Sequence, residues 1–184
     1  MRKLPVLAIF LCSLVCVRAA SAQDTRSFGV TMGYPASIGV LWHFNEAVAV
    51  RPEFAFDFFS SESDNLSPIV GADNSSDGHA VSVGLSALFY VARWDMTRAY
   101  VVPRYAYMHT SSSIEGPFAI LSDSTGNGHD VSVSFGAQHN LGDRFAIYGE
   151  LGLAYERAKT ELTTSELRRT GFGTRSGVGV VVYF

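Results

Sequence analysis

The sequence predicts an all-β protein, an eight-stranded antiparallel up-and-down transmembrane β-barrel. Three observations support this class. Apolar residues alternate with small or polar residues at a period of two, and the connections between the alternating segments are short and long in turn. After residue 22, no apolar run approaches the ~18 residues that a membrane helix needs. Because successive side chains of a strand point to opposite faces, each predicted strand has one apolar face.

The N-terminal segment 1–22 has the three parts of a secretory signal peptide. Residues 2–3 are Arg-Lys, residues 4–17 are almost wholly apolar, and residues 20–22 read Ala-Ser-Ala, an A-x-A cleavage site. We therefore expect this segment to be removed and residues 23–184 to form one barrel domain. An uncleaved membrane anchor is disfavoured because the apolar run is short for a spanning helix.

Composition narrows the function classes. Both cysteines, Cys12 and Cys16, lie in the segment that is expected to be removed, so we expect no disulfide and no thiolate metal site in the domain. Charged residues make up 17% of the chain and the net charge is −3, which gives no polyelectrolyte signal for a nucleic-acid partner. No cofactor is expected. A mean hydropathy of +0.16 in an exported chain without an apolar helix agrees with a sheet in a membrane.

Eight segments carry the alternation, and each is predicted to be one strand. They are residues 28–34, 37–44, 48–58, 80–91, 101–107, 131–138, 145–155 and 172–184. Leu41 interrupts the second segment, because it falls on the polar side. The even number of strands places both chain ends at the same end of the barrel.

The connections between these segments alternate in length. The short turns are residues 45–46, 93–97 and 142–143. On the other side lie long links near 60–78, 110–128 and 158–170, with one tight turn at 34–36. Bacterial outer-membrane barrels have short periplasmic turns and longer extracellular loops. We therefore expect both termini on the periplasmic side.

Two strands begin with nearly the same phrase, GHAVSVGL at residues 78–85 and GHDVSVSF at residues 128–135. Each phrase follows a polar run that contains glycine, and each would descend from an extracellular loop with valines toward lipid and Ser or Gly toward the lumen. His79 and His129 are interpreted as rim residues at the level of the lipid headgroups. A metal site is disfavoured because no companion ligands occur at metal-site spacing.

Charged residues in mid-strand decide which face points inward. Six of them share the small and polar face: Arg51, Glu53, Asp57, Arg104, Glu150 and Arg175. Turned toward lipid, each arginine near the midplane would cost about 2–4 kcal/mol. The sequence therefore predicts a polar network in the lumen. The alternative is a soluble lipocalin-like barrel with the apolar set inside, but the Gly, Ala and Ser of the polar set are too small for a solvated exterior.

Aromatic residues form two bands near the expected strand ends, as rings do at membrane interfaces. The periplasmic band contains Phe28, Trp42, Phe44, Trp94, Phe145 and Phe184. The extracellular band contains Tyr34, Phe58, Tyr107 and Tyr155. The chain ends on Val182-Tyr183-Phe184, and Phe184 at the end of an alternating strand resembles the signal that the outer-membrane assembly machinery reads.

Residues 23–184 resemble the small eight-stranded outer-membrane barrels, the OmpA-transmembrane-domain, OmpX and Ail type. The resemblance lies in the architecture and in the terminal VVVYF. It implies a monomer in the bacterial outer membrane, surrounded by lipids and lipopolysaccharide. Side chains fill the interior of an eight-stranded barrel, so free diffusion of solutes is not expected.

We expect a non-enzymatic protein that acts in envelope integrity or surface interaction through its extracellular loops. Segments 60–78, 112–127 and 158–170 are the expected contacts with a surface partner. The last segment and its flank are mixed to basic, and their cations suit lipopolysaccharide phosphates: Arg157, Lys159, Arg168 and Arg169.

Three sharper hypotheses stay open beside this one. Residues 73–78 (DNSSDG) begin like a calcium loop, but Gly84 stands where the bidentate acid is expected. His109 and Ser111 resemble the His-Ser pair of lipid A deacylases, but no carboxylate is evident to orient the histidine. A route for small hydrophobic molecules, as in OmpW-like barrels, would need an apolar lumen, which the six charges oppose.

Overall fold

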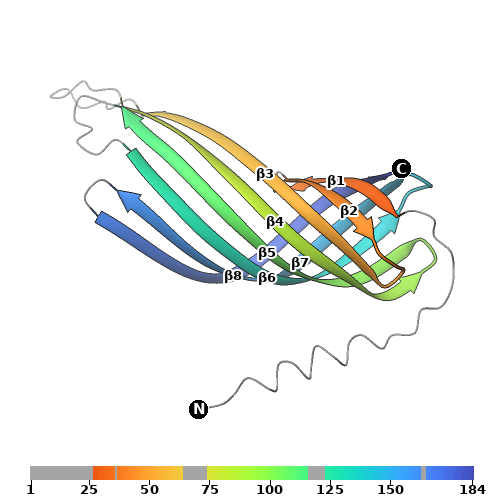
Figure 1. The fold of residues 1–184 in the computed structure, drawn as a ribbon. Helices are drawn as coiled ribbons and strands as arrows, with labels where there is room; N and C mark the ends of the chain where they lie inside the picture. The colour runs from red at the N-terminus through yellow and green to blue at the C-terminus, as the bar shows by residue number, and fades with distance from the viewer. Residues whose placement is uncertain (1–26, 36, 64–73, 116–122, 163–164) are drawn as a thin grey trace, which may run out of the picture.

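The computed structural model describes residues 27–35, 37–63, 74–115, 123–162 and 165–184. These residues form eight antiparallel strands that pair in chain order around a closed barrel, so the predicted fold class is confirmed (Figure 1). The strands are β1 (Phe28–Tyr34), β2 (Ser37–His43), β3 (Val48–Ser63), β4 (Asn74–Trp94), β5 (Thr97–Glu115), β6 (Asp123–Asn140), β7 (Phe145–Leu162) and β8 (Ser165–Tyr183). No helix in the described part of the chain is long and apolar enough to cross a membrane. The predicted signal peptide, residues 1–22, lies outside the described residues.

Six of the strands run far beyond their predicted ends. Strands β3 to β8 have 16–21 residues, and their pairing continues into the segments 60–78, 110–128 and 158–170 that the sequence suggested were loops. That expectation is wrong for the residues of these segments that the structure describes. Antiparallel pairing uses backbone groups, so a polar Ser-, Thr- and Gly-rich segment can remain in a sheet without an apolar face.

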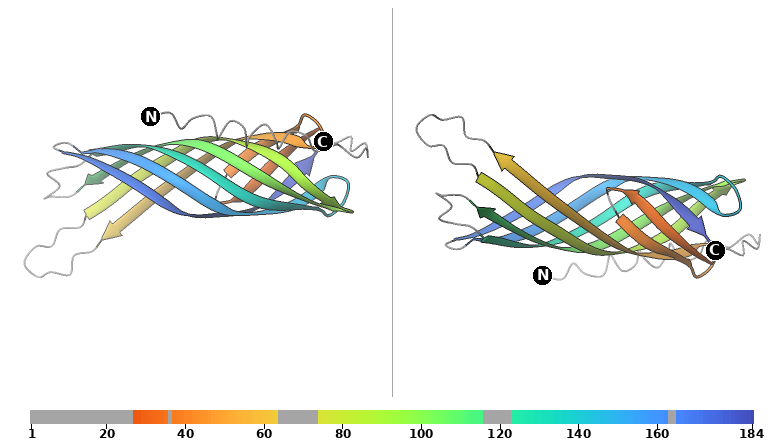
Figure 2. Two further views of the ribbon diagram at one scale, coloured as in Figure 1. Left: turned by 90° about the horizontal axis from the view of Figure 1, so that it is seen from below. Right: turned by 90° about the horizontal axis from the view of Figure 1, so that it is seen from above.

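The first two strands are much shorter, with 7 residues each. The hairpin of β1 and β2 closes the ring by pairing with residues 178–183 of β8 and residues 49–54 of β3. We call this part of the barrel the closed half. Beyond the hairpin, β3 and β8 continue without a described strand between them, and Figure 2 shows the orange hairpin ending well short of both. We call this part the open half.

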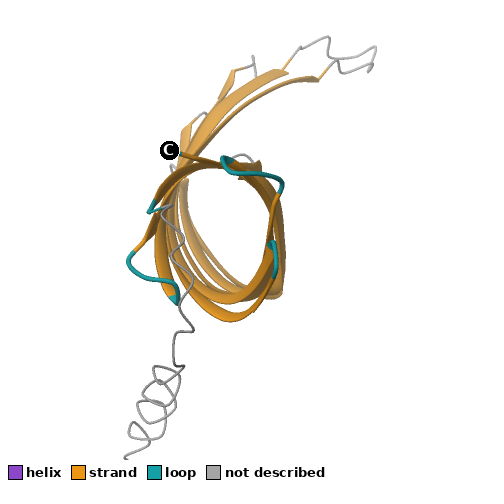
Figure 3. Cartoon of the chain, turned by 90° about the vertical axis from the view of Figure 1, so that its right-hand side faces the viewer, coloured by secondary structure: helices purple, strands orange, loops and turns teal. Residues whose placement is uncertain are grey.

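The space between residues 55–63 of β3 and residues 165–177 of β8 is called the gap here. Seen along the barrel from the end that carries the short turns, the closed half forms a ring and long strands of the open half curve away from it (Figure 3). Both strands that border the gap pair on their other side, β3 with β4 and β8 with β7. Each therefore has one paired edge and one edge toward the gap.

The apolar set points outward, as the charged residues predicted. Large exposed side chains cover the outer surface of every strand, among them Phe54, Leu85, Val133 and Leu151. The charged mid-strand residues Arg51 and Glu53 are instead buried. A lipocalin-like barrel requires the opposite arrangement, so the structure contradicts that alternative.

The closed half has a packed core near the end of the barrel that carries the short turns. Its fully buried side chains include Leu41, Leu88, Tyr100, Val102 and Val181. Leu41 therefore breaks the polar pattern of β2 because this level of the interior is apolar.

Aromatic rings also pack on glycines inside the barrel. A Cβ at Gly179 would lie 2.5 Å from both Tyr148 Oη and the Met32 carbonyl oxygen, and a Cβ at Gly136 would lie 2.5 Å from the Tyr100 ring. The small inward residues of the sequence pattern therefore make room for tyrosines in the lumen.

The outer aromatic residues are exposed, but the extracellular band is not at the strand ends. Phe58, Tyr107 and Tyr155 lie inside β3, β5 and β7, because these strands continue beyond them. Tyr34 ends β1 and pairs with Val178 of β8. The hairpin tip therefore lies well short of the end of the barrel that the long strands β3 to β8 reach.

Candidate functional site

Six charged side chains in the barrel interior form a continuous series in which acids and bases alternate. In order of contact they are Glu150 of β7, Arg51 and Glu53 of β3, Arg104 of β5, Asp130 of β6 and Arg175 of β8. We call this series the charge ladder. The alternation of strands brings it together, because each member lies on the inward face of its strand.

The inner end of the ladder is tightly bonded. Arg51 donates from Nη1 to Glu150 Oε1 at 2.8 Å and from Nη2 to Oε2 at 3.1 Å, a bidentate pair. Its Nε lies 2.7 Å from Glu53 Oε1. The Tyr100 hydroxyl donates to Glu150 Oε1 at 2.9 Å, and the Arg51 guanidinium lies 5.0 Å from the centre of the Tyr148 ring. Arg51 is thus buried, with two hydrogen bonds to Glu150 and an ion pair with Glu53 in which Nε forms no hydrogen bond.

The other end of the ladder becomes looser toward the open half. Arg104 donates from Nε to Glu53 Oε2 at 2.7 Å and from Nη1 to Asp130 Oδ1 at 3.0 Å. Arg175 Nη1 is 4.0 Å from the same Asp130 oxygen, beyond hydrogen-bond distance, and its side chain is 28% exposed. Arg175 is therefore the most weakly held and most exposed member.

Five of the six predicted lumen residues are in this ladder. The exception is Asp57, which is exposed and forms no ion pair with any of the described residues. It lies on β3 beyond the hairpin, in the open half, where the interior is no longer enclosed. Asp130 takes its place, and the sequence signal for it was its inward position in the phrase GHDVSVSF.

A second polar cluster, which the sequence analysis missed, lies near the end of the barrel that carries the short turns. Gln138 is 2% exposed; its Nε2 donates to the Tyr183 hydroxyl at 2.6 Å, and its Oε1 accepts from the Tyr90 hydroxyl at 3.4 Å. His43 Nε2 lies 2.9 Å from that Tyr90 oxygen. The inward parity of Tyr90, Gln138 and Tyr183 on their strands was the available signal. Together with the ladder, this cluster fills the closed half with side chains.

The structure contains only some of the contacts that the His-Ser hypothesis requires. His109 Nδ1 lies 2.8 Å from Asn127 Oδ1, which also accepts a hydrogen bond from the Tyr107 hydroxyl at 2.7 Å. Asn127 therefore orients His109, a contact that the sequence did not suggest. Among the described residues, however, no hydrogen bond joins His109 to Ser111, which a general base and its nucleophile require.

The described part of the segment in the calcium hypothesis is a strand and not a loop. Asp73 lies outside the described residues, and residues 74–78 are extended in β4 and paired with residues 59–63 of β3. A calcium loop must curl around its ion. Within the described ranges, no three His, Cys, Asp or Glu side chains are grouped as metal ligands would be. His129 bonds to the Tyr105 hydroxyl at 2.8 Å on the exposed surface.

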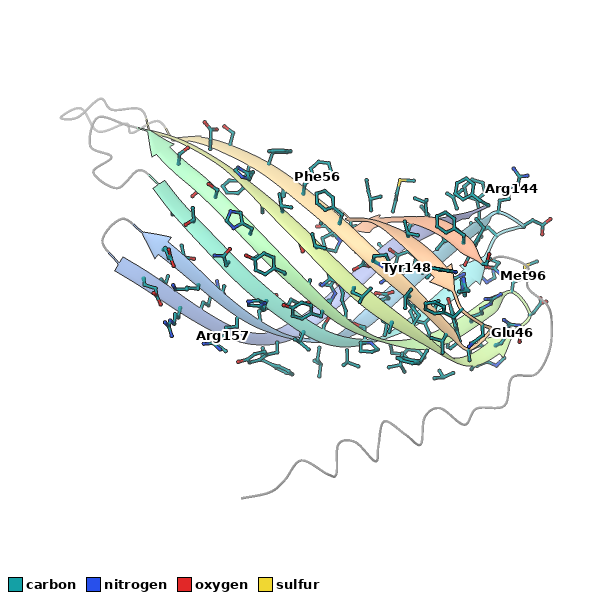
Figure 4. All side chains as sticks on the ribbon, in the orientation of Figure 1. Glu46, Phe56, Met96, Arg144, Tyr148 and Arg157 are labelled. Carbon is teal, nitrogen blue, oxygen red and sulfur yellow. The ribbon has the colours of Figure 1, made fainter. Side chains whose placement is uncertain are left out.

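The remaining predicted residues lie on the outer surface. Phe184 is 79% exposed, its ring centre is 6.3 Å from that of Phe28, and its role as an assembly signal stays a prediction. Figure 4 shows Phe56 and Arg157 on the outside of the barrel and Tyr148 within it. The expected contact segments 60–78, 112–127 and 158–170 extend into residues 64–73, 116–122 and 163–164, which lie outside the described residues.

Comparison with known proteins identifies solved structures with a similar architecture. No protein-family model matches the chain, and no curated protein matches it in sequence. A major outer membrane protein from Thermus thermophilus has a similar structure, with a TM-score of 0.58 at 14% identity over 85% of this chain and 98% of that one. Neisserial surface protein A gives a TM-score of 0.44 at 14% identity over 85% and 92%. The chain thus has the fold of the small eight-stranded outer-membrane barrels that its sequence resembles.

Proposed function

We propose that this protein is a non-enzymatic outer-membrane barrel whose filled lumen is structural and whose extracellular strands carry its activity in envelope integrity or surface interaction. Residues 1–22 would direct export, and residues 23–184 would form the inserted domain. The fold of the small outer-membrane barrels supports the general kind of protein.

The observation that carries the proposal is the separation of charge and apolar surface. The ladder holds three arginines and three carboxylates inside, while the outer surface carries exposed aromatic or aliphatic side chains on every strand. Exposed apolar patches of soluble monomers rarely exceed a few hundred Å². A surface that is apolar around the whole barrel is suited to lipid and would aggregate in water.

The outer ends of β7 and β8 offer cations to lipopolysaccharide phosphates, but to different extents. Glu166 bonds to both Lys159 and Arg168, at 3.0 Å and 2.5 Å, and Lys159 also bonds to Glu161 at 2.5 Å. These bonds raise the pKa of Lys159, so its charge is locally compensated. Arg157 and Arg169 are exposed, and within the described chain neither forms an ion pair. We propose these two arginines as the phosphate contacts.

Gel mobility tests the proposed class. Protein from the outer-membrane fraction is run in SDS with and without boiling, and a folded barrel should migrate differently from the boiled chain. Protein found in the soluble fraction with a single mobility would overturn the proposal. The lipid A mass of overproducing cells should be unchanged, and loss of an acyl chain that depends on His109 and Ser111 would show an enzyme instead.

The surface role needs a separate test. Shortening the β3–β4 connection within residues 60–78, or the β5–β6 connection within residues 112–127, should leave the heat-dependent mobility shift intact. Cell adhesion or serum survival should fall in at least one of these variants. Full adhesion and survival in both would contradict the surface role while leaving the barrel class standing.

A further inference from the structure

The gap lies at the depth of the membrane. A tilted strand needs about 9–11 residues to cross the bilayer, whereas β1 and β2 have 7 each. The hairpin tip reaches only Val178 of β8, six positions from the terminal Phe184. About three or four further residues of β3 and β8 therefore border the gap within the outer-leaflet side of the apolar belt.

Strand edges at this depth require something to cover them. Open sheet edges do not occur facing lipid in the hydrocarbon region unless they are covered or line a water-filled cavity. Residues 55–58 of β3 and 174–177 of β8 have no strand on the gap side within the described chain. An occupant of the gap must therefore bring polar groups as well as apolar surface.

The inner face of β8 beside the gap is bare except for one cation. Its inward positions are Gly171, Gly173, Arg175 and Gly177. A Cβ at Gly171 or Gly173 would meet no atom within 4 Å. Arg175, the loosest member of the ladder, follows Gly173 on this face, and its guanidinium is 4.0 Å from Asp130. This leaves open space beside an incompletely compensated positive charge.

The outer rims of the gap are apolar. Phe56 and Phe58 of β3 and Phe172 of β8 are exposed. At the hairpin tip, a groove of about 390 Å³ runs over Gly149 and is lined by Tyr34, Val178, Leu151 and Phe135, among others. The groove exists because Gly149 has an outward position but no side chain, and a Cβ there would also meet no atom within 4 Å.

We propose that the gap binds one phosphate-bearing membrane lipid, with its phosphate at the Arg175 guanidinium and an acyl chain in the groove at Tyr34. A guanidinium matches a phosphate through paired N–H donors. The head of the lipid lies toward the extracellular side and its chain toward the midplane, which is the orientation of an outer-leaflet lipid. The inference rests on the proposed function, because only a barrel inserted in the outer membrane has its gap in the outer leaflet.

A second copy of the chain is a poorer occupant. In a two-fold dimer, one patch of each copy meets the same patch of the other. Pairing of β8 with β8, or of β3 with β3, would leave the other edge of each gap uncovered. A single lipid has no such symmetry, so it need not leave one edge of the gap uncovered.

Native mass spectrometry of the detergent-extracted barrel tests the proposal, with the heat-dependent mobility shift checked first for every variant. Phosphatidylglycerol, diacylglycerol with the same chains, and inorganic phosphate serve as probes. The wild-type barrel should hold one phosphatidylglycerol, and neither diacylglycerol nor inorganic phosphate should displace it. Arg175→Gln should weaken retention roughly tenfold, as for a lost hydrogen bond to a charged group. The matched control Arg144→Gln, an exposed arginine in the short turn before β7 and far from the gap, should retain the lipid as wild type does.

A second variant keeps the arginine and fills the space beside it. Gly173→Trp should lose the lipid although Arg175 remains, and it stands in for Arg175→Gln if that variant does not fold. Equal retention in wild type, Arg175→Gln and Gly173→Trp would overturn the inference, as would a dimer without lipid. A barrel that shows the mobility shift but holds no lipid refutes this inference alone. A chain that shows no shift refutes the proposed function as well.

Discussion

The closed and open halves of this barrel follow the same alternation but are held together differently. In the closed half, inward positions carry Tyr, Leu and paired charges, and Arg51 and Gln138 are only 3% and 2% exposed. In the open half, inward positions of β8 carry Gly171 and Gly173, with free space beside them. A pattern with a period of two therefore sets the direction of a side chain, whereas the length of β1 and β2 decides whether that direction leads into a core.

The largest difference in the free energy of unfolding should come from a substitution at the inner end of the ladder. Arg51→Leu leaves Glu150 without its bidentate partner and Glu53 with one partner fewer, and removing one member of a buried ion pair costs about 3–5 kcal/mol. The free energy of unfolding in urea, measured in lipid vesicles, should fall by this amount. Arg157→Leu, on the exposed surface, should change it by less than about 0.5 kcal/mol. Equal effects of the two substitutions would show that the ladder does not stabilise the closed half.

The two arginines at the outer end of the ladder have the same inward position in the sequence pattern, but they differ in their contacts. Arg104→Ala removes hydrogen bonds to both Glu53 and Asp130, so it should cost about 3 kcal/mol. Arg175→Ala removes a contact of 4.0 Å from a partly exposed side chain and should cost about 1 kcal/mol or less. Unfolding midpoints of the two variants in the same vesicles give the order directly. A larger loss for Arg175→Ala would mean that the ladder tightens toward the gap.

A smaller difference in stability is expected between substitutions at two inward glycines of β8. Gly179→Ala in the closed half meets Tyr148 and the Met32 carbonyl, and such overpacking costs about 1–3 kcal/mol. Gly173→Ala in the open half meets nothing within 4 Å and should lie within about 0.5 kcal/mol of wild type. Since neither glycine has a positive φ, backbone strain does not enter the comparison. Equal destabilisation would show that the open half is packed after all.

Sequence periodicity anticipated the faces of the strands better than their pairing. The inward parity of Arg51, Arg104 and Glu150 follows from alternation alone, and the cost of charge in lipid then fixes the orientation of the barrel. Asp57 and Asp130 have the same parity, and only the register of the strands shows that one lies in the open half and the other in the ladder.

The strand ends and the gap could not be predicted from the sequence, for a different reason. Segments such as 110–115 and 123–128 are polar, so hydrophobic alternation could not distinguish a solvated strand from a loop. The gap depends on which residues of β3 and β8 the short hairpin reaches, a long-range property that one strand's sequence does not contain. The glycines of β8 gave the remaining clue, because a row of inward glycines without tyrosines above them indicates an unfilled interior.

Labelling of two single cysteines on β4 tests the division into halves most directly. Ser82 and Ser86 both point inward, but Ser86 is fully buried between Arg51 and Arg104 of the neighbouring strands, whereas Ser82 is half-buried in the open half. In intact cells, a membrane-impermeant maleimide should label Ser82→Cys and leave Ser86→Cys unlabelled. Labelling of both would reveal a water path through the ladder and contradict a filled lumen. Labelling of neither would contradict the open half.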